Sequence, residues 1–464
     1  MRRTQDRAAP ATLPLGTKLA YSAADFAAAL SYIALNTWLL YFLVNIAGLP
    51  PLQAGAVFVL GRLVDAGLDP VIGSLSDRLE PTVGRLIFLR WGAVPAGASF
   101  ALLFGLPLGP EAQFFAALAG LVLYSVLYTF VTMPYLALLP ELAPGYDERT
   151  VLNAYRLAFG LSANLVAVAA PPAIVVAVTG SADLASSPPA GWLVAAILFG
   201  FLMSAGLLIT GFGVREPRVA VPRVAARPTL LSEMRAAFGT HGFWQVFVIF
   251  MTVTLGFMVT NSVLPFFLES ALRLSAGEQP VVLLALFGTA LLTSPLWTYL
   301  SARIGKKGAL ALGLGLEVAS LLLLVSAVPA GLSSALFAVV ALNACGLAAV
   351  TLFPWAMLPD VVEFSELASG RRREGLFYAL FTFGQKVAGS LGVFANALII
   401  SAFDYQQGSS EQSLETLRGL YLAIGPVAAA VFGLAAVFVW LYPVTRETHR
   451  AAQAALAQRA KVEG

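Results

Sequence analysis

The sequence is poor in charged residues, which make up only 11% of its 464 positions. A soluble globular domain carries about 25% charged residues, whereas this chain is 59% hydrophobic and has a mean hydropathy of +0.82. A soluble protein of this composition could not cover its own surface with polar groups, but a bilayer accommodates apolar side chains. The composition therefore excludes a soluble enzyme and predicts a polytopic α-helical membrane protein.

Cysteine and histidine are almost absent, and enzymatic motifs are missing. Cys345 is the single cysteine and excludes an intramolecular disulfide, and the only histidines are His241 and His449. The sequence has no metal-binding Cys/His cluster, no phosphate-binding loop and no Gly-x-Ser-x-Gly serine elbow. We therefore expect no enzymatic activity, no cofactor, and no ATP-driven transport unless a partner subunit supplies it. The net charge of +3 is small, and we expect a monomer with no nucleic-acid partner.

Long apolar segments are abundant. A membrane-spanning helix needs about 20 mostly apolar residues. We expect twelve spans, at 20–46, 51–76, 86–107, 112–140, 150–179, 190–213, 241–268, 279–302, 308–328, 331–359, 375–402 and 416–443. The polar, Arg-bearing residues 1–19 lead directly into the first span, so no cleaved signal peptide is expected. The predicted fold is an all-α membrane protein of twelve transmembrane helices.

The longest polar stretch separates two groups of six spans. It runs from Val214 to Thr240 and contains five arginines and three prolines. We expect an N-terminal six-helix bundle at 1–213, a central loop at 214–240, a C-terminal six-helix bundle at 241–443 and a tail at 444–464. Residues 230–238 could form a short amphipathic helix on the membrane surface.

Basic residues are concentrated on one side of this topology. They lie in both termini, in the central loop and in the turns after the second, fourth, eighth and tenth spans, whereas the other side has only Arg273 and Arg418. Basic loops remain on the cytoplasmic side of a membrane. We therefore expect a multi-pass protein of the cytoplasmic (inner) membrane with both termini and the central loop in the cytoplasm.

The two groups of spans resemble each other in sequence. Residues 69–78 align without a gap to residues 294–303, and Pro, Leu, Ser and Arg recur at equivalent positions. The repeated pairs that follow are Gly84-Arg85 with Gly305-Lys306, and Pro140-Glu141 with Pro359-Asp360. Two halves of the same orientation indicate a parallel repeat, which is typical of major facilitator transporters with a substrate site between the halves.

Two carboxylates in the second span are the sharpest candidate site. An ionisable residue inside a bilayer is costly and usually faces a cavity. Asp65 and Asp69 are one helical turn apart and share a face. Two such carboxylates repel each other unless a proton or cation lies between them, which is what a coupling site needs. The alternative is that Arg62, one turn before Asp65, simply neutralises one acid.

Other polar residues within the spans are candidates for substrate binding. Tyr128, Thr129 and Thr132 lie in the fourth span, although Ser and Thr hydroxyls often bond only to the backbone or a neighbouring helix. Arg156 lies in the first turns of the fifth span and either binds substrate or extends to the membrane surface. Lys386 lies in the middle of the eleventh span, where a buried Lys needs an anionic partner or loses its proton.

Charged residues at the cytoplasmic helix ends could form salt bridges that latch the two halves together. The candidates for this gating are Asp77, Arg78, Arg85, Asp360, Glu363 and Arg372. The alternative is that they only contribute to the cytoplasmic positive charge. Asp25 and Glu317 are single acids in apolar spans, and we expect each to be locally bonded or near an interface. Trp355 either lines the cavity or packs within the bundle.

Several short motifs carry a family resemblance that extends over nearly the whole chain. They are residues 61–70 with Gly73, 76–78 with 84–85, 134–138 with 140–141, 148–150 with 155–156, and 359–363 with 370–372, 374–375 and Lys386. On these motifs the sequence resembles the glycoside-pentoside-hexuronide:cation symporter family, typified by melibiose permease, in the major facilitator superfamily. The resemblance implies two pseudo-symmetric six-helix bundles. It also implies that Asp65, Asp69 and Thr129 form a cation-coupling site, with Na⁺ at Asp65 and Asp69 if Na⁺ is the ion. Tyr128, Arg156 and Lys386 match residues that line the family's sugar cavity.

Several positions depart from the melibiose-type pattern. Leu68 replaces a sodium-site Asn and offers no oxygen ligand, so H⁺ competes with Na⁺ as the coupling ion. Ala29 and Thr132 each replace an Asp that binds the sugar. Leu136 replaces a Trp that stacks on the sugar ring. Galactoside specificity is therefore not expected to carry over, and some relatives of this fold carry lysolipids.

The function that we expect is secondary active symport by alternating access, coupling H⁺ or Na⁺ to a small polar solute of the glycoside, pentoside or hexuronide kind. Asp65 and Asp69 are expected to offset the charges of Arg156 and Lys386 in the empty site, so a bound cation leaves surplus positive charge that suits an anionic solute. The alternatives are a cation-coupled lysolipid or amphiphile transporter on the same fold, and a non-transporting receptor, which would need a long soluble signalling domain that the sequence lacks.

Overall fold

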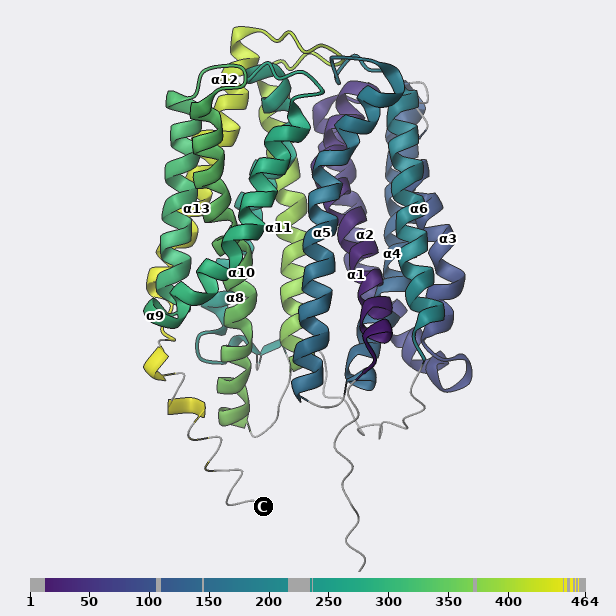
Figure 1. Cartoon of the computed structure of the whole chain (residues 1–464), viewed down its shortest axis with the longest axis vertical. Coiled ribbons are helices and arrows are strands. Elements are labelled where there is room, and N and C mark those ends of the chain that lie inside the picture. The colour runs from purple at the N-terminus through teal and green to yellow at the C-terminus, as the bar shows by residue number, and fades with distance from the viewer. Residues whose placement is uncertain are drawn as a thin grey trace, which may run out of the picture.

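The computed structural model of the chain describes residues 13–105, 110–143, 146–215, 234–235, 237–369, 374–444, 446–448, 451–453, 455 and 458. In these ranges the chain forms a bundle of long helices that run roughly side by side (Figure 1). The first helix begins and the last one ends at the same end of the bundle, which we call the terminal end. The other end is called the opposite end.

Six of the described helices form the N-terminal half. They are α1 (Leu15–Tyr41), α2 (Pro51–Val83), α3 (Leu86–Leu103), α4 (Pro110–Leu142), α5 (Tyr146–Thr179) and α6 (Pro189–Gly213), and α1 continues into a π-helical turn, η1 (Phe42–Ile46). Within this half α1 packs against α5 and α6, α3 against α4 and α6, and α2 against α4.

The C-terminal half is built in the same way. It contains α8 (Phe243–Phe266) with the π-helical turn η2 (Phe267–Ala271), α9 (Gln279–Ala327), α10 (Ser334–Ser369), α11 (Glu374–Ala402), and a last span made of α12 (Leu414–Leu422), η3 (Ala423–Val427) and α13 (Ala428–Leu441). Gly305 breaks α9 into two spans, because its φ of 77° is left-handed and glycine adopts that conformation at no steric cost. The break lies between the predicted spans 279–302 and 308–328.

The helices are long and apolar enough to cross a membrane. Ten described helical stretches meet this criterion, and one of them is the whole of α9. With α2, which packs between α4 and α11, and with α9 counted as two, the described chain has the twelve predicted spans. Trp91, Phe115 and Trp440 are 74%, 70% and 77% exposed, as suits side chains that face lipid. The prediction of an all-α twelve-span protein is confirmed.

Glycines bring α3 and α6 into close contact. A Cβ atom added at Gly97 would lie 2.1 Å from the carbonyl oxygen of Gly200, and one added at Gly200 would lie 2.3 Å from that of Gly97. Small residues allow helix backbones to approach in a membrane, where burying a large apolar side chain gains little over leaving it in lipid.

An ion pair recurs at equivalent positions of the two halves. Arg85 Nε lies 2.9 Å from Glu141 Oε1 in the N-terminal half, and Lys306 Nζ lies 2.6 Å from Asp360 Oδ1 in the C-terminal half. Each basic residue follows a glycine with left-handed φ. The sequence repeat therefore corresponds to a repeated structural unit at the terminal end.

Candidate substrate cavity and coupling site

A cavity of about 570 Å³ lies between the two halves. Its walls come from α1, α2, α4 and α5 on one side and from α10 and α11 on the other. The predicted site residues that line it are Tyr128, Thr129, Thr132, Arg156 and Lys386. Asn153 and Asn164 also line it. They were not among the predicted site residues, although a polar amide in an apolar span is a signal that the sequence offers.

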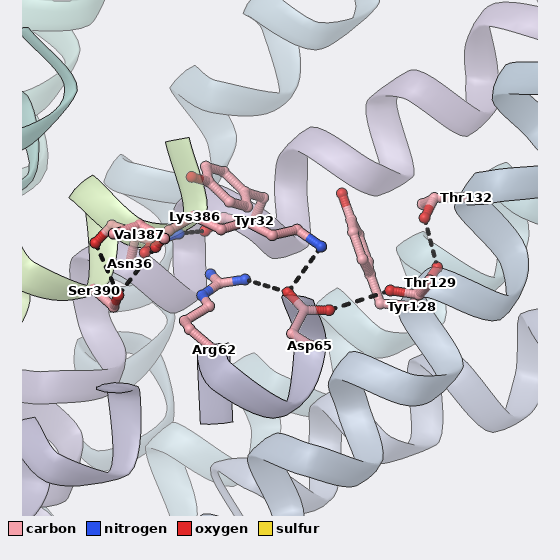
Figure 2. Close-up of polar contacts among 10 residues, drawn as sticks. All are labelled: Tyr32, Asn36, Arg62, Asp65, Tyr128, Thr129, Thr132, Lys386, Val387 and Ser390. Atoms are coloured by element: carbon pink, nitrogen blue, oxygen red, sulfur yellow. Dashed lines mark hydrogen bonds and ion pairs between the residues drawn. The ribbon is translucent and has the colours of Figure 1, made fainter. Parts of the chain in front are cut away.

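Asp65 is the centre of a polar cluster at this cavity (Figure 2). Its Oδ2 atom lies 3.2 Å from Nη1 of Arg62 and 3.0 Å from Nζ of Lys386. Its Oδ1 atom accepts a hydrogen bond of 3.2 Å from the hydroxyl of Thr129. Asp65 is 1% exposed, and a buried charge is tolerated only when it is paired and hydrogen-bonded. The cluster provides both conditions.

Three helices bring these side chains together. Arg62 precedes Asp65 by three residues on α2, so the two share a face. Thr129 is on α4, which packs against α2, and Lys386 is on α11 of the other half, which also packs against α2. The Asp65–Lys386 ion pair therefore joins the two halves at the edge of the cavity. The alternative in which Arg62 alone neutralises an acid does not describe Asp65, because two cations share its carboxylate.

Arg156 pairs with Asp25. Its Nε and Nη2 atoms lie 2.5 Å and 3.1 Å from the two oxygens of Asp25, and the hydroxyl of Tyr135 donates a hydrogen bond of 2.5 Å to the same carboxylate. The expectation had Asp65 and Asp69 offset the charge of Arg156, but the described carboxylate that pairs with Arg156 is Asp25, because α1 packs against α5.

The partner of Arg156 had a signal in the sequence. Asp25 precedes Ala29 by one helical turn on α1 and both line the cavity. Ala29 is the position at which melibiose-type transporters carry an Asp, so this chain has a carboxylate on the same helix face, one turn nearer the terminal end. Asp25 bonds to side chains of α4 and α5 and lines the cavity, rather than bonding only to residues near it in the sequence.

The remaining polar candidates have mixed surroundings. Thr132 donates a hydrogen bond of 2.8 Å to the carbonyl oxygen of Tyr128, one turn earlier, while still lining the cavity. Trp355 lines the cavity and also packs against Phe250, with ring centroids 4.9 Å apart, so both interpretations of it hold. Glu317 is buried away from this cavity and accepts a hydrogen bond from an amide of α10.

The charged residues predicted for gating are described only in part. Arg85 and Asp360 pair within their own halves, and Glu363 accepts a hydrogen bond of 3.4 Å from Gln453. The side chains of Asp69, Asp77 and Arg78, the whole of Arg372 and most of the segment 230–238 lie outside the described residues. A latch between the halves at the terminal end stays a prediction.

Hydrogen bonds join the two halves at the opposite end. The hydroxyl of Tyr405 donates to the side-chain oxygen of Asn45 at 3.2 Å, and the amide of Gln407 donates to the carbonyl oxygen of Leu49 at 2.9 Å. The cavity reaches Arg156, which lies early in α5 and so toward the terminal end. The cavity is thus separated from the opposite end by contacts between the halves.

Comparison with known families identifies this architecture. A family model described as MFS/sugar transport protein matches residues 20–446. The chain belongs to this family. It is therefore a multi-span membrane transporter that carries a small molecule across a bilayer, and not an enzyme.

Relatives of the chain include transporters with different named cargoes. An uncharacterized symporter of Synechocystis is 29% identical, over 93% of this chain and 95% of that protein. A sodium-dependent lysophosphatidylcholine symporter of Danio rerio is 26% identical, over 89% and 83% of the two chains. The isoprimeverose transporter of Lactiplantibacillus pentosus is 25% identical, over 94% and 90%. These relatives and the family model confirm the sugar–cation symporter resemblance.

Solved structures with the same fold are also transporters. A bacterial homolog of the human lysosomal transporter Spinster, in an inward-facing and occupied conformation, matches with a TM-score of 0.68 and 14% identity, over 92% of this chain and 95% of that chain. The nucleoside transporter NupG matches with a TM-score of 0.63 and 14% identity, over 92% and 100%. At this level of identity the likeness concerns the fold alone.

Proposed function

We propose that the chain is a secondary active symporter that couples H⁺ or Na⁺ to the uptake of a small polar solute by alternating access. Its two bundles, at 1–213 and 241–443, rock about the cavity. We propose further that the terminal end faces the cytoplasm, in the inner membrane, because the basic residues lie there. The observation that carries the proposal is the buried Asp65–Lys386 pair, which links the two halves beside the cavity.

The pair suggests how ion and solute are coupled. While Lys386 holds Asp65, it occupies a carboxylate oxygen that a coupling ion needs. A solute that draws Lys386 away leaves the buried Asp65 with Arg62 as its remaining charged partner, and losing one partner of a buried ion pair is costly. A proton or cation arriving at Asp65 removes that cost, and Thr129 is already placed to bond the carboxylate. Solute binding and ion binding therefore assist each other.

The ion is H⁺ or Na⁺, and the surroundings of Asp65 favour H⁺. Na⁺ needs several oxygen ligands, but Leu68 provides none and Asp65 Oδ2 already faces two cations. A proton needs one oxygen only. The relatives named sodium-dependent keep Na⁺ as the rival.

The solute is proposed to carry an anionic group. Among the described side chains, the cations at the cavity are Arg62, Arg156 and Lys386, and the acids are Asp25 and Asp65. Asp25 pairs with Arg156, while Arg62 and Lys386 share Asp65, so the empty site already has one positive charge in surplus. Once a cation or proton joins Asp65, that surplus grows by one, and Lys386 is the group that lost its partner. A carboxylate, sulfonate or phosphate on the solute would offset it.

A lysolipid or other amphiphile is the second candidate solute. One observation favours it: Leu136, Leu157 and Leu161 line the cavity beside the charged groups, and the first two are 45% and 57% exposed. Such a wall suits an acyl chain, while Lys386 would hold a phosphate headgroup. A relative named as a lysophosphatidylcholine symporter supports the same candidate.

Transport by aspartate variants tests the coupling. We expect Asp65→Asn and Asp69→Asn each to abolish uphill accumulation of solute in proteoliposomes, while solute binding or exchange survives in part because the ion and solute sites are distinct. The exposed Glu415→Gln variant, which makes the same chemical change at the opposite end, should accumulate solute like the parent. Uphill accumulation by both aspartate variants would exclude these residues as the coupling site.

A ligand screen identifies the solute class. Purified protein is heated with sugars, uronides, sulfonates or lysolipids, each with and without Na⁺ and at low and high pH. A ligand that binds only the folded protein raises the melting temperature. Stabilisation by a neutral sugar alone would contradict the anionic solute. Transport that needs Na⁺ and ignores a pH gradient would contradict the preference for H⁺.

A further inference from the structure

A buried carboxyl group at the opposite end is held by the other half of the protein. Glu269 lies in η2 of the C-terminal half and is 4% exposed. Its Oε1 atom accepts hydrogen bonds of 2.8 Å and 2.9 Å from the backbone N–H groups of Leu184 and Ala185, and its Oε2 atom accepts one from the hydroxyl of Tyr41. All three donors belong to the N-terminal half, so Glu269 connects the two halves.

A second carboxyl group touches the first. Asp183 precedes Leu184 in the loop between α5 and α6, and its Oδ1 atom accepts a hydrogen bond of 3.0 Å from the same N–H of Ala185 that donates to Glu269. Two carboxyl groups this close do not both ionise readily, because the like charges repel and burial strengthens the repulsion. A closed arrangement therefore favours one proton shared between the two groups.

The surroundings of Asp183 indicate which group carries the proton. Burial acts to raise the pKa of Asp183, but hydrogen bonds from Glu269, from the hydroxyls of Ser410 and Ser186, and from the N–H of Ala185 outweigh it and lower the pKa. These donors favour the ionised form of Asp183 and leave Glu269 as the group of the pair that takes up a proton more readily.

Other charged groups face the same pair. Arg273, Glu278 and Glu411 line the cavity of about 560 Å³ that Glu269 and Asp183 also line. Glu278 accepts hydrogen bonds of 2.8 Å from the N–H and hydroxyl of Ser275, within its own half. Acids exceed bases in this cavity, which further favours uptake of a proton.

We propose that Glu269 and Asp183 form a proton-binding site that closes the opposite end of the transporter. When the site holds a proton, the pair forms a hydrogen bond between the halves. When the proton leaves, two adjacent carboxylates repel each other across the seam and the halves separate there. In the proposed orientation this end is extracellular, so external acid closes the outer gate. The site lies apart from Asp65 and does not depend on which solute is carried.

The sign of the pH dependence follows from proton binding. The closed state binds one more proton than the open state, so low pH favours closure and rising pH favours opening. In the pH range where the two states differ by one full proton, the open-to-closed ratio rises by about tenfold per pH unit.

Distances between spin labels test the site directly. The labels are attached at Ala190→Cys and Leu414→Cys, two exposed positions on the N- and C-terminal halves at the opposite end, in a Cys345→Ala background. Double electron–electron resonance then measures the distance between the halves without solute. From about pH 5 to about pH 9, we expect the population with the longer distance to grow, since carboxyl groups in such sites titrate in this range.

Three variants separate the proton site from a merely structural contact. Glu269→Gln resembles the protonated group and should keep the short distance at every pH. Asp183→Asn removes the like charge and should keep the halves closed to higher pH than the parent. Glu278→Gln makes the same change in the same cavity but not in the pair, and it should respond to pH like the parent.

Two results would overturn the proposal. One is a label distance in the parent that does not change with pH. The other is a parent-like pH response in both Glu269→Gln and Asp183→Asn. Neither measurement involves transport, so a failure here leaves the proposed symport untouched, and a failure of symport leaves the gate untouched.

Discussion

Lys386 is the residue on which the proposed anion specificity depends. Its ammonium group ion-pairs with Asp65 and so links that carboxylate to the C-terminal half. We expect Lys386→Ala to weaken binding of an anionic solute by roughly ten- to a hundredfold, the range for a lost hydrogen bond to a charged group. Lys386→Arg should restore part of the affinity, because it keeps the charge with a different shape. Isothermal titration of the ligand found in the screen measures this.

The outcome that would contradict this role is plain. If the ligand is a neutral sugar, and both Lys386→Ala and Arg156→Ala bind it as tightly as the parent, the charge argument fails. The pairing of Arg156 with Asp25 predicts a difference between the two alanine variants. Since Asp25 already neutralises Arg156, the loss of affinity in Arg156→Ala should be smaller than in Lys386→Ala.

The Asp25–Arg156 pair is open to a double-mutant test. Removing one partner of a largely buried ion pair leaves the other uncompensated, which destabilises a protein more than removing both. We expect Asp25→Asn and Arg156→Gln each to lower the melting temperature, and the double variant to lower it by less than the sum. A coupling of about 0.5–3 kcal/mol is typical of groups in contact. Exact additivity would show that the pair contributes nothing to stability.

At this scale the sequence predicted residue types better than partners. The Lys386 prediction, that a deeply buried Lys needs an anion, led directly to Asp65. The partner of Arg156 was misassigned, because the pairing depends on how α1 packs against α5, and such packing is set by side chains far from either residue. Glu269 was not considered at all, since it lies at the end of a predicted span, where an acid has no unusual cost.

The sequence predicts the break within α9 well, but it does not predict where the long helices α2 and α10 end. The two spans of α9 were separated by their hydropathy, and Gly305 lies at the break. In contrast, α2 extends to Val83 and α10 to Ser369, well past the predicted ends at 76 and 359. Hydropathy marks where the membrane ends, but backbone hydrogen bonds continue a helix into water without apolar side chains.

The contact of α3 with α6 yields a prediction for glycine. A Cβ at Gly97 would meet backbone atoms of α6 at 2.1 Å, which the helices can relieve only by moving apart. We expect Gly97→Ala to destabilise the protein by about 1–3 kcal/mol, the usual cost of overpacking. Gly288→Ala is the matched control, because a Cβ there meets nothing within 4 Å, and alanine should stabilise that helix slightly. Thermal unfolding in detergent compares them, and equal melting temperatures would contradict the close packing.

For the whole molecule, the prediction concerns its orientation in the membrane. We expect reporter fusions after Gly464 and within residues 216–233 both to be active as cytoplasmic reporters, because the basic residues of the termini and central loop resist translocation. A fusion in the loop 180–188, at the opposite end, should be active as a periplasmic reporter. A periplasmic signal from either of the first two would reverse or break the topology.

The architecture as a whole was accessible from the sequence because it repeats. The span count, the equivalence of the halves and the Gly-basic turns all follow from local patterns that occur twice. The closure of the opposite end could not be predicted from the sequence. It depends on hydrogen bonds from Tyr405 to Asn45 and from Gln407 to Leu49. These residues lie about 360 positions apart, and no local pattern in either segment indicates its partner.

The ion pair of Asp65 with Lys386 also bears on how the carrier returns after delivering its cargo. Under the proposed symport, the empty carrier must return to its first conformation with the cavity closed, and a buried carboxylate short of charged partners would oppose that closure. Lys386 would then take the place of the departed ion at Asp65, so the carboxylate stays paired during the return. A carrier that has taken up the ion without its solute would hold that ion, Arg62 and Lys386 at one carboxylate, and we expect it to stall. The expected consequence is little slippage, with hardly any ion leaking across when no solute is present.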